Sequence, residues 1–530
     1  MIFSENATGT YYLERKSHPE KSMNWNYAKY SWESIEKFGE YNILTYEEKT
    51  IEEQHSNRAL FSRSHTLAAS LMGLGIARGD IVAVVLPNHP SVPVAFMGIF
   101  KAGAVFLPVV FGLAAQEIHY ILKDSKAVAI ITNMELYAKV FEAAKGLANI
   151  KHTIITGNDV LPAAAISFES LTSGQPASLE MAHMDADDPA VLMYTSGTTG
   201  FPKGVVLTHR NISSNLLDGL PAWSTGVEDI CLVPLPLNHI YGMLMINECN
   251  ITGARLIIHK WFDPELVLSS ITKHKVTQFV GVPTMLIKLL ETYDPERHNL
   301  SSIRRWISAA APLSRETLKA VERTLGGTVY EGYGMTETSP TISRQREGNA
   351  RKPGSVGTAI SNVEISIFDE HDRSLPVGRE GEICVRGPNV MKGYLNRPEE
   401  TSDTLRNGWM HTGDMGHLDE DGDLFITGRK KDIIIRGGEN ISPGAVEEAL
   451  FTHPAIQEAA VVGIPDALYG EEVKGFVVLH DGCTVSEEEL INHCLKTMPR
   501  FKAPKSITFL KELPKSPVGK VLKRELRQMG

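Results

Sequence analysis

The residues best suited to chemistry form a glycine-rich loop, Tyr194–Gly204, with the sequence YTSGTTGFPKG. The loop follows the apolar run Ala190–Met193, which predicts a strand leaving the core. Glycines allow backbone N–H groups to approach a ligand closely, and the Ser, Thr and Lys side chains add donors that suit phosphate oxygens. It is not a Walker A loop, because Lys203 is followed by Gly204 and not by Ser or Thr. Composition alone leaves a flexible surface loop as the alternative.

Four further motifs follow this loop along the chain. They are Glu331–Glu337 (EGYGMTE), Trp409–Asp414 (WMHTGD), Gly428–Asp432 (GRKKD) and Pro517–Lys520 (PVGK). With the loop, they resemble the signatures of the adenylate-forming superfamily, which includes acyl-CoA synthetases, firefly luciferase and the adenylation domains of peptide synthetases. The resemblance covers nearly the whole chain, because the five motifs stand in the expected order over more than 300 residues.

The resemblance implies that residues of these motifs hold ATP or AMP together with magnesium. The nucleotide ligands would be Thr195, Ser196, Gly197, Thr198, Thr199, Gly200, Lys203, Ala310, Glu331, Gly332, Tyr333, Gly334, Thr336, Asp414, Arg429 and Lys520. Thr198 and Glu337 would hold the Mg²⁺ ion, which prefers oxygen ligands. Tyr333 offers a flat face for adenine, and Asp414 suits the two ribose hydroxyls. A half-buried core tyrosine and a turn aspartate are the structural alternatives for these two residues.

Lys520 is the strongest catalytic candidate. ATP and a carboxylate nucleophile repel each other until cations neutralise their charges. By resemblance, the Lys520 ammonium would be delivered to the α-phosphate and the carboxylate, where it would stabilise the developing charge. Lys203 and His239 are the other catalytic candidates. The resemblance places His239 beside the substrate carboxylate, and a packed core histidine is the alternative.

The resemblance also implies a second reaction at the same site, in which a thiol attacks the acyl-adenylate. Lys431 matches the hinge about which the small C-terminal domain rotates between the two reactions. The rotation would withdraw Lys520 and bring Gly437 and Gly438 toward the pantetheine of coenzyme A. A simple turn is an equally good interpretation of the two glycines.

The acyl pocket is expected near Pro236–Gly242 and Gly281–Met285, and the small segment Ser308–Pro312 is expected between this pocket and the adenine. The candidate acyl-binding residues are His239, Tyr241, Gly281, Ala309 and Gly334. No Asp or Glu lies between Cys231 and Asn247 to pair with a substrate ammonium, which disfavours an amino acid substrate. The pattern resembles fatty-acyl-CoA and related synthetases. It indicates a hydrophobic acid of the medium- or long-chain fatty-acid type, converted through acyl-AMP to the acyl-CoA thioester with release of AMP and pyrophosphate.

Three alternatives stay open. The first is an aryl or cyclic carboxylic acid–CoA ligase with the same mechanism, and the second is an enzyme that transfers its product to a carrier protein. The third is a non-catalytic, nucleotide-binding regulatory relative, and the joint presence of Lys203, Glu337, Asp414, Arg429 and Lys520 argues against it. Chain length is not readable, because one methylene in an apolar pocket changes binding by only about 1–3 kcal/mol.

The elements that must position these residues alternate between short apolar runs and helix-like segments. The predicted strands are Ile81–Leu86, Val128–Thr132, His152–Thr156, Ala254–His259 and Val276–Val280. Ile51–Leu74 and Pro264–Lys275 have the length and spacing of helices. This alternation predicts an α/β fold with predominantly parallel sheets covered by helices.

The pattern changes after about Gly354. The short strands Val363–Asp369, Glu382–Arg386 and Leu424–Thr427 predict a small β-barrel-like element. The tail predicts, in order, helix Ser442–Phe451, strands Ala459–Ile464 and Val473–Leu479, helix Ser486–Thr497 and strand Ser506–Leu510. We therefore expect a large N-terminal adenylate-forming domain, residues 1–430, and a small mobile α+β C-terminal domain, residues 431–530.

Composition bounds these hypotheses. The chain has 530 residues, of which 42% are hydrophobic and 22% charged, as in soluble globular proteins of several domains. A formal charge of −10 argues against a dedicated nucleic-acid binder. No segment is apolar for long enough to span a bilayer, and neither a signal peptide nor a disulfide framework is evident. We expect a cytoplasmic enzyme with small-molecule partners, and a homodimer is left open.

Overall fold

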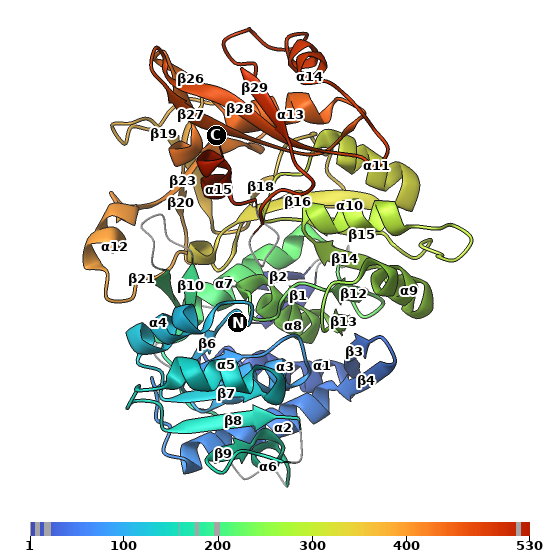
Figure 1. Ribbon diagram of the computed structural model, residues 1–530. Helices are drawn as coiled ribbons and strands as arrows, with labels where there is room; N and C mark the ends of the chain where they lie inside the picture. Colours follow the sequence, from blue (N-terminus) through green and yellow to red (C-terminus); the bar gives the residue numbers. More distant parts are fainter. Residues whose placement is uncertain are drawn as a thin grey trace.

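The computed structural model describes residues 2–5, 11–14, 23–157, 160–174, 180–195, 202–515 and 521–529, with the backbone alone described for residues 2–5, 11–14 and Asn440. A smaller C-terminal domain, orange to red in Figure 1, lies above a larger N-terminal domain. Strands β1 (Ile2–Glu5) and β2 (Tyr11–Glu14) pair as an antiparallel ribbon. Within the described ranges, no helix has both the length and the apolar character needed to cross a membrane.

The first large sheet has eight strands and a parallel centre. Its order is β21 (Gly393–Tyr394), β11 (Lys203–Thr208), β10 (Pro189–Thr195), β6 (Val105–Pro108), β5 (Ile81–Val85), β7 (Ala129–Asn133), β8 (His152–Thr156) and β9 (Ala165–Ser167). Strand β11 runs antiparallel to both of its neighbours, β10 and β21. The glycine-rich loop of the sequence connects β10 to β11.

The second large sheet has nine strands, six of them parallel. Its order is β18 (Thr358–Ala359), β17 (Thr341–Arg344), β16 (Thr328–Gly334), β15 (Arg305–Ser308), β14 (Gln278–Gly281), β12 (Ile230–Val233), β13 (Arg255–His259), β3 (Asn42–Glu48) and β4 (Ile51–Ser56). Strands β17, β18 and β4 pair antiparallel at the two edges. The predicted α/β class with predominantly parallel sheets is confirmed.

Alternating side chains place helices on both faces of each sheet. Val82 and Val84 of β5 belong to the core between the two sheets, whereas Ala83 and Val85 belong to a core on the outer face. The inner layer contains α2 (Asn57–Gly73), α3 (Ser91–Lys101) and α8 (Ile240–Thr252), and the outer layer contains α4 (Ala115–Ser125) and α5 (Met134–Ala144). Helix α3 is buried on every side because it packs against β5 and β6 of the first sheet and against α2 within the shared core.

The outer face of the second sheet is covered in the same way. Leu232 and Ile257 pack there with α9 (Pro264–His274), α10 (Pro283–Thr292) and α11 (Arg315–Leu325). The remaining helices are α1 (Lys29–Phe38), α6 (Phe168–Thr172), α7 (His209–Gly219), α12 (Pro398–Thr404) and the 3₁₀ turns η2 (Leu220–Ala222), η3 (Thr336–Thr338) and η4 (Lys430–Asp432). The N-terminal domain is therefore a stack of alternating helical and sheet layers.

The predicted helix Ile51–Leu74 is wrong in its first six residues. Residues Ile51–Ser56 form the edge strand β4, which pairs antiparallel with β3. Helix α2 begins only at Asn57, where the Ser56 Oγ accepts a hydrogen bond from the N–H of Ala59. The edge strand is polar and exposed, so it lacks the apolar alternation that identifies a half-buried strand.

Two smaller sheets follow. The first contains β19 (Glu364–Phe368), β20 (Gly381–Arg386), β22 (Leu405–Arg406), β23 (Trp409–Leu418) and β24 (Leu424–Arg429). The second, in the C-terminal domain, contains β25 (Ile434–Arg436), β26 (Glu439–Ile441), β27 (Ile456–Asp466), β28 (Gly470–Leu479) and β29 (Ser506–Phe509). Helices α13 (Pro443–Phe451) and α14 (Glu487–Cys494) pack on one face of that sheet, and α15 (Lys523–Gln528) packs on the other. The predicted elements of the tail agree with these within a few residues.

Candidate active site

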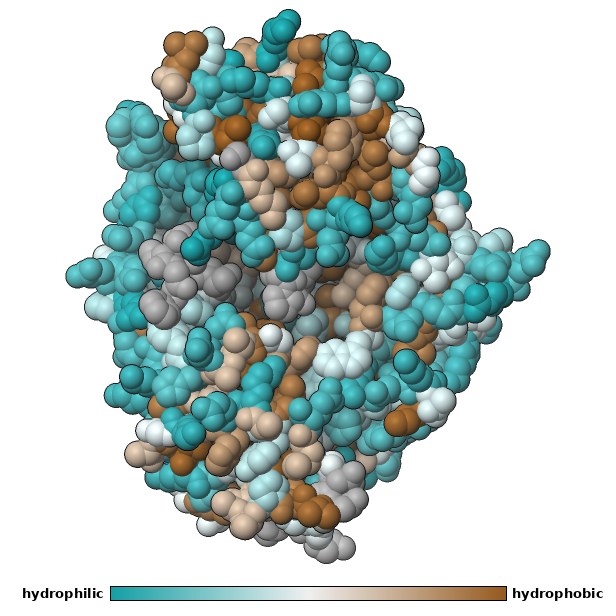
Figure 2. Space-filling model, viewed as in Figure 1, coloured by the Kyte–Doolittle hydropathy of each residue, from teal (hydrophilic) through white to brown (hydrophobic). Residues whose placement is uncertain are grey.

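A large cavity, with a volume of about 980 Å³, lies between the second sheet, the small sheet of β19–β24 and the C-terminal domain. Figure 2 shows the surface hollowed at this level, between the upper and lower parts of the molecule. Its lining comes from residues as far apart in the sequence as Asn88 and Lys515. Folding therefore concentrates distant segments around one space, large enough for a nucleotide together with an acyl group.

Most of the predicted site residues that the structure describes line this cavity. They are Thr195, Lys203, His239, Tyr241, Gly281, Ala309, Ala310, Gly332, Tyr333, Gly334, Thr336, Glu337, Asp414, Arg429 and Lys431. Three predicted residues are described but do not line it: Glu331, Gly437 and Gly438. The others lie outside the described residues: Ser196, Gly197, Thr198, Thr199, Gly200 and Lys520.

Sheet topology explains the convergence. Strands β14, β15 and β16 are parallel, so their carboxyl ends meet at one edge of the sheet. Gly281 ends β14, Ala309 follows β15, and Gly332 to Gly334 end β16. Ala310 has φ +71°, a left-handed conformation that residues with a Cβ seldom adopt, so the chain turns sharply after β15 along the cavity wall.

On one side of β16, three polar side chains form a connected group. The Tyr333 hydroxyl donates to Asp414 Oδ2 at 2.6 Å, and Arg429 Nε lies 3.2 Å from Asp414 Oδ1. Asp414 and Arg429 are direct partners in the register of β23 and β24. Burial, and then the neighbouring Asp414 carboxylate, raise the pKa of Tyr333 well above its usual value, so the hydroxyl stays a donor. The Asp414 carboxylate, which can only accept hydrogen bonds, is thereby held at the cavity wall.

A second polar group holds the other charges of the site. Lys203 Nζ lies 5.2 Å from the centre of the Tyr394 ring, and the Tyr394 hydroxyl donates to Glu337 Oε1 at 3.1 Å. Burial raises the pKa of Tyr394, with Glu337 the next cause, so Tyr394 remains protonated and donates to the carboxylate. A cation therefore lies near the ring of Tyr394, and a carboxylate oxygen lies at its hydroxyl.

His239 is the N-cap residue of α8, and its Nδ1 accepts from the N–H of Tyr241 at 3.4 Å. The preceding Asn238 is buried and donates to the carbonyls of Leu86 and Val109, at 2.5 and 3.4 Å. Asn238 thus ties the turn to the carboxyl ends of the first sheet, and His239 is the residue that reaches the cavity.

Glu331 has a different environment from the one its motif predicts. Its side chain is 6% exposed, and its Oε1 has no hydrogen-bond partner in the described part of the chain. Burial, followed by the charge of Glu448 in the C-terminal domain, raises its pKa to about 8. The carboxyl therefore lies against the domain interface and not in the cavity.

Gly437 and Gly438 are exposed on the C-terminal domain. Both have positive φ, +59° and +88°, and the Gly437 N–H donates to the carbonyl of Tyr469 at 2.8 Å. They form the turn between β25 and β26. In this domain arrangement they do not line the cavity, which the C-terminal domain reaches through Lys431 and Lys515.

The sequence interpretation missed several cavity residues. Tyr394 lies on the two-residue strand β21, and only its pairing with β11 brings it to the site. Trp223 and Arg344 also line the cavity, from the end of η2 and from β17. None of the three stands at a diagnostic distance from a motif, so only tertiary pairing reveals them.

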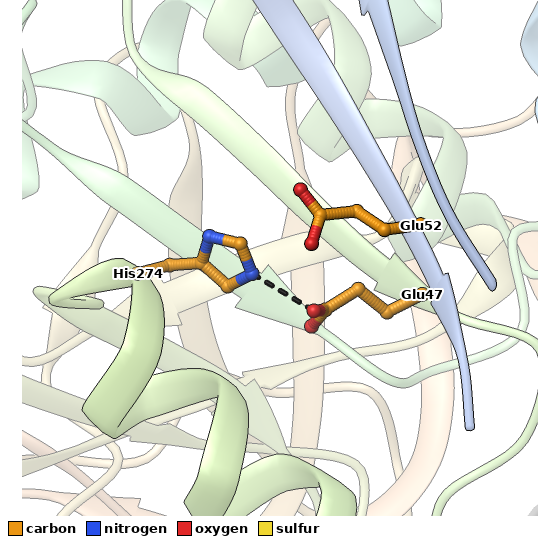
Figure 3. A group of neighbouring side chains, drawn as sticks. All are labelled: Glu47, Glu52 and His274. Atoms are coloured by element: carbon orange, nitrogen blue, oxygen red, sulfur yellow. Dashed lines mark hydrogen bonds and ion pairs between the residues drawn. The ribbon is translucent and has the colours of Figure 1, made fainter. Parts of the chain in front are cut away.

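A separate group of side chains, Glu47, Glu52 and His274, lies near the sheet edge formed by β3 and β4, away from the cavity (Figure 3). His274 Nε2 lies 2.9 Å from Glu47 Oε1, and Lys273 Nζ contacts both carboxylates, 2.8 Å from Glu47. Lys273 supplies the positive charge that two carboxylates need. We therefore interpret the group as an ion-pair cluster that ties α9 to the sheet edge, and not as a metal centre.

Comparison with known proteins agrees with this architecture. The model of the AMP-binding enzyme family matches residues 32–395, and that of the AMP-binding enzyme C-terminal domain matches residues 445–520. The solved structure of ATP-bound MatB from Rhodopseudomonas palustris superposes with a TM-score of 0.87 at 30% identity, covering 96% of this chain and 99% of that one. Helix-covered sheets with a smaller C-terminal domain are thus an adenylating-enzyme fold.

Two characterised relatives are similar over most of the chain. Identity is 40% over 491 residues with the long-chain-fatty-acid–CoA ligase of Bacillus subtilis (strain 168), covering 87% of each protein. It is 36% over 510 residues with 4-coumarate–CoA ligase 2 of Petroselinum crispum, covering 94% of this chain and 93% of the relative. The chain belongs to the AMP-binding enzyme family, and it is therefore a member of the adenylate-forming superfamily.

Proposed function

We propose that this protein is an AMP-forming acid–CoA ligase that activates a hydrophobic carboxylic acid. ATP and the acid would form an acyl-adenylate and pyrophosphate, and coenzyme A would then displace AMP to give the thioester. The observation that carries the proposal is the gathering of Lys203, His239, Glu337, Asp414 and Arg429 around one cavity.

The polar groups divide into two tasks. Asp414, held by Tyr333 and Arg429, would accept hydrogen bonds from the ribose hydroxyls. Lys203 would lie against phosphate oxygens and lower the repulsion that the acid carboxylate meets. Lys520 remains the proposed catalytic cation; it lies outside the described residues.

Glu337 fits a magnesium ligand by its chemistry and position. It lines the cavity, is 7% exposed, and accepts a hydrogen bond from Tyr394, the residue whose ring lies near Lys203. A carboxylate oxygen is the kind of donor that Mg²⁺ prefers, and Thr198 is the proposed second ligand. When bound, the ion would neutralise phosphate charge. Glu337 itself holds the Tyr394 hydroxyl, and so fixes the ring over which Lys203 lies.

The apolar part of the cavity supports a hydrophobic acid. Its lining includes Leu235, Trp261, Val282, Met285 and Ile307. Such side chains stabilise a chain or ring by roughly 25 cal/mol for each Å² of apolar surface removed from water. His239 lies in the same wall and would position the acid carboxylate toward the nucleotide.

We also propose the domain boundary at residues 430 and 431, with Lys431 as hinge. The contacts between the two domains include polar pairs at the surface, such as Arg315 Nε to Glu448 Oε1 at 3.9 Å. Exposed pairs of this kind contribute little free energy, so they can be exchanged at small cost. Rotation would then bring Gly437 and Gly438 to the cavity for the thioester step.

A panel of acids tests the proposal. The purified protein is incubated with ATP, Mg²⁺ and coenzyme A and with aliphatic acids of graded length, aryl acids and cyclic acids. AMP release is measured, and the thioester is identified by mass spectrometry. Coenzyme A is omitted in a parallel set, in which acyl-adenylate and pyrophosphate should still form.

Two variants make the result specific. Lys203→Met should lower AMP release at least tenfold, while Lys319→Met, on the exposed surface of α11, should leave it unchanged. Thioester formation confined to aryl acids would replace the fatty-acid class by an aryl-acid class, which the 4-coumarate relative makes the second candidate. Release of neither AMP nor pyrophosphate with any acid would refute the proposal.

A further inference from the structure

The cavity wall contains a buried arginine that the proposed chemistry does not use. Arg344 ends β17, is 3% exposed and lines the cavity. Its guanidinium carbon lies 4.4 Å from the centre of the Trp223 ring and 5.9 Å from that of Tyr241, and both aromatic residues also line the cavity. A positive charge is therefore placed beside two aromatic rings of the cavity wall.

The hydrogen bonds of Arg344 are few and long. Nη1 donates to the Gly219 carbonyl at 3.5 Å, and Nη2 donates to Thr341 Oγ1 at 3.3 Å. A guanidinium has five N–H donors, and hydrogen bonds of this type usually measure 2.7–3.2 Å. Among the described residues, no carboxylate lies within 4.0 Å of Arg344, the limit for an ion pair.

Arg305 shows how this fold compensates a buried arginine that has only a structural role. It is 1% exposed on β15, and it has Glu347 at 2.9 Å, Asp229 at 3.2 Å and Gln278 at 3.0 Å. Both arginines are buried near the same sheet, but only Arg305 has carboxylate partners. The deficit of Arg344 is therefore a local feature of the cavity wall.

The buried acid Glu248, whose charge interacts with that of Arg344, does not change this conclusion. Glu248 of α8 is 2% exposed, does not line the cavity and forms no ion pair within 4.0 Å with Arg344. Burial raises the pKa of Glu248, and the charge of Arg344 opposes this only in part. The raised pKa favours the uncharged form of the acid. The aromatic rings stabilise the arginine charge in part, since cation–π contacts contribute about 0.5–2 kcal/mol.

Strand alternation separates Arg344 from the nucleotide residues. In the register of β16 and β17, Gly332 opposes Arg344 and Tyr333 opposes Ser343. Neighbouring residues of a strand face opposite sides, so Tyr333 with Asp414 is on one face and Arg344 with Tyr241 on the other.

We propose that Arg344 binds an oxygen-bearing group, above all a carboxylate, at the end of the acid substrate remote from the reacting carboxyl. The inference rests on the proposed function, since it concerns the acyl end of the same cavity. A plain alkyl end would seal the guanidinium from water without supplying an acceptor, and a buried unpaired charge is costly. A distal carboxylate would supply two acceptors in the geometry that a guanidinium matches.

Matched acids of equal length provide the test: octanoic acid, 8-hydroxyoctanoic acid and octanedioic acid. For the wild type, we expect kcat/KM to be highest for the dicarboxylate, at least about tenfold above octanoate, and intermediate for the hydroxy acid. Arg344→Met should abolish this preference and leave or raise the rate with octanoate, whereas Arg344→Lys should retain part of it. Arg323→Met, at the exposed end of α11, is the matched control and should leave kcat/KM unchanged with both octanoic acid and octanedioic acid.

Thermal shift with each acid and AMP gives a readout that needs no turnover. Octanedioate should raise the melting temperature of the wild type more than octanoate does, and Arg344→Met should remove that difference. A wild-type preference for octanoate in both assays, or an equal loss with both acids in Arg344→Met and Arg344→Lys, would overturn the inference and leave Arg344 a structural role. Failure of every acid to release AMP would refute the ligase proposal, and the binding difference would still decide the role of Arg344.

Discussion

Glu331 allows a sharp test, because its motif and its environment assign it different roles. The motif predicts a nucleotide contact, whereas the structure buries the carboxyl beside Glu448, outside the cavity lining. Glu331→Gln keeps the shape of the side chain and removes its charge. If the structure is the better guide, the substitution should alter the pH dependence of stability and have little effect on ATP binding.

The magnitude follows from the pKa of Glu331. Burial and then Glu448 raise that pKa from 4.5 to about 8, so near neutral pH the folded protein keeps a proton that the unfolded chain has lost. Stability linked to this proton is fully present below pH 4.5 and is lost as the pH rises through 8. Linkage gives a loss of about 2.5 kcal/mol between pH 5 and pH 7. Glu331→Gln has no such proton to lose, so between pH 5 and pH 7 its unfolding free energy should rise relative to that of the wild type by about this amount.

Tryptophan fluorescence during urea unfolding provides the assay, because all six tryptophans belong to the larger domain. They are Trp25, Trp32, Trp223, Trp261, Trp306 and Trp409. Unfolding midpoints are compared at intervals from pH 5 to pH 8 for the wild type, Glu331→Gln and the exposed control Glu399→Gln on α12. Parallel midpoint curves for the wild type and Glu331→Gln would refute the assignment of a buried, protonated carboxyl.

Three other substitutions test the described contacts. Asp414→Asn should weaken the ribose contact and lower ATP–pyrophosphate exchange by about 10- to 100-fold with a near-normal melting temperature, and unchanged exchange would contradict the role of Asp414. Burial lowers the pKa of His209 to about 3 in the folded protein, against 6.5 in the unfolded chain. Between pH 8 and pH 5 the wild type should therefore lose about 2 kcal/mol of unfolding free energy that His209→Asn does not lose. Urea unfolding that gives the two proteins the same change of unfolding free energy with pH would exclude this effect. Burial also lowers the pKa of Lys101, so the free energy that this lysine costs the folded state grows as the pH falls below 10.5. Lys101→Met should therefore be more stable than the wild type at pH 7 and lose that advantage toward pH 10, which calorimetry can measure.

The central strands could be predicted from the sequence because burial on both faces selects β-branched residues. The residues of Ile81–Val85 predict a strand from their own types, without information on the neighbouring elements. Ile51–Ser56 could not be predicted, because its residues are polar and only the pairing with β3 makes them a strand. Local sequence thus predicts an element where the element's own residues supply its stability, and fails where a neighbour does.

The same distinction applies to the candidate site. Residues such as Gly281 and Tyr333 could be placed because they end core strands and lie within recognisable motifs. Tyr394 could not, since β21 is a two-residue strand positioned by β11, nearly two hundred residues earlier. Arg344 could not either, because the pairing of β17 with β16 brings it to the cavity wall.

The pair Gly332 and Tyr333 explains how one strand can serve both substrates. Tyr333 extends toward Asp414 on one face, while Gly332, lacking a side chain, leaves its face open to Arg344, whose Cγ would lie 3.6 Å from a Cβ added there. A helix would project adjacent residues about 100° apart around a single axis, whereas a strand sends them to opposite sides. The nucleotide and the far end of the acid can therefore be recognised by neighbouring positions without sharing a surface. If both proposals hold, specificity for the acid can change on the Arg344 face while the groups proposed to hold the nucleotide stay in place.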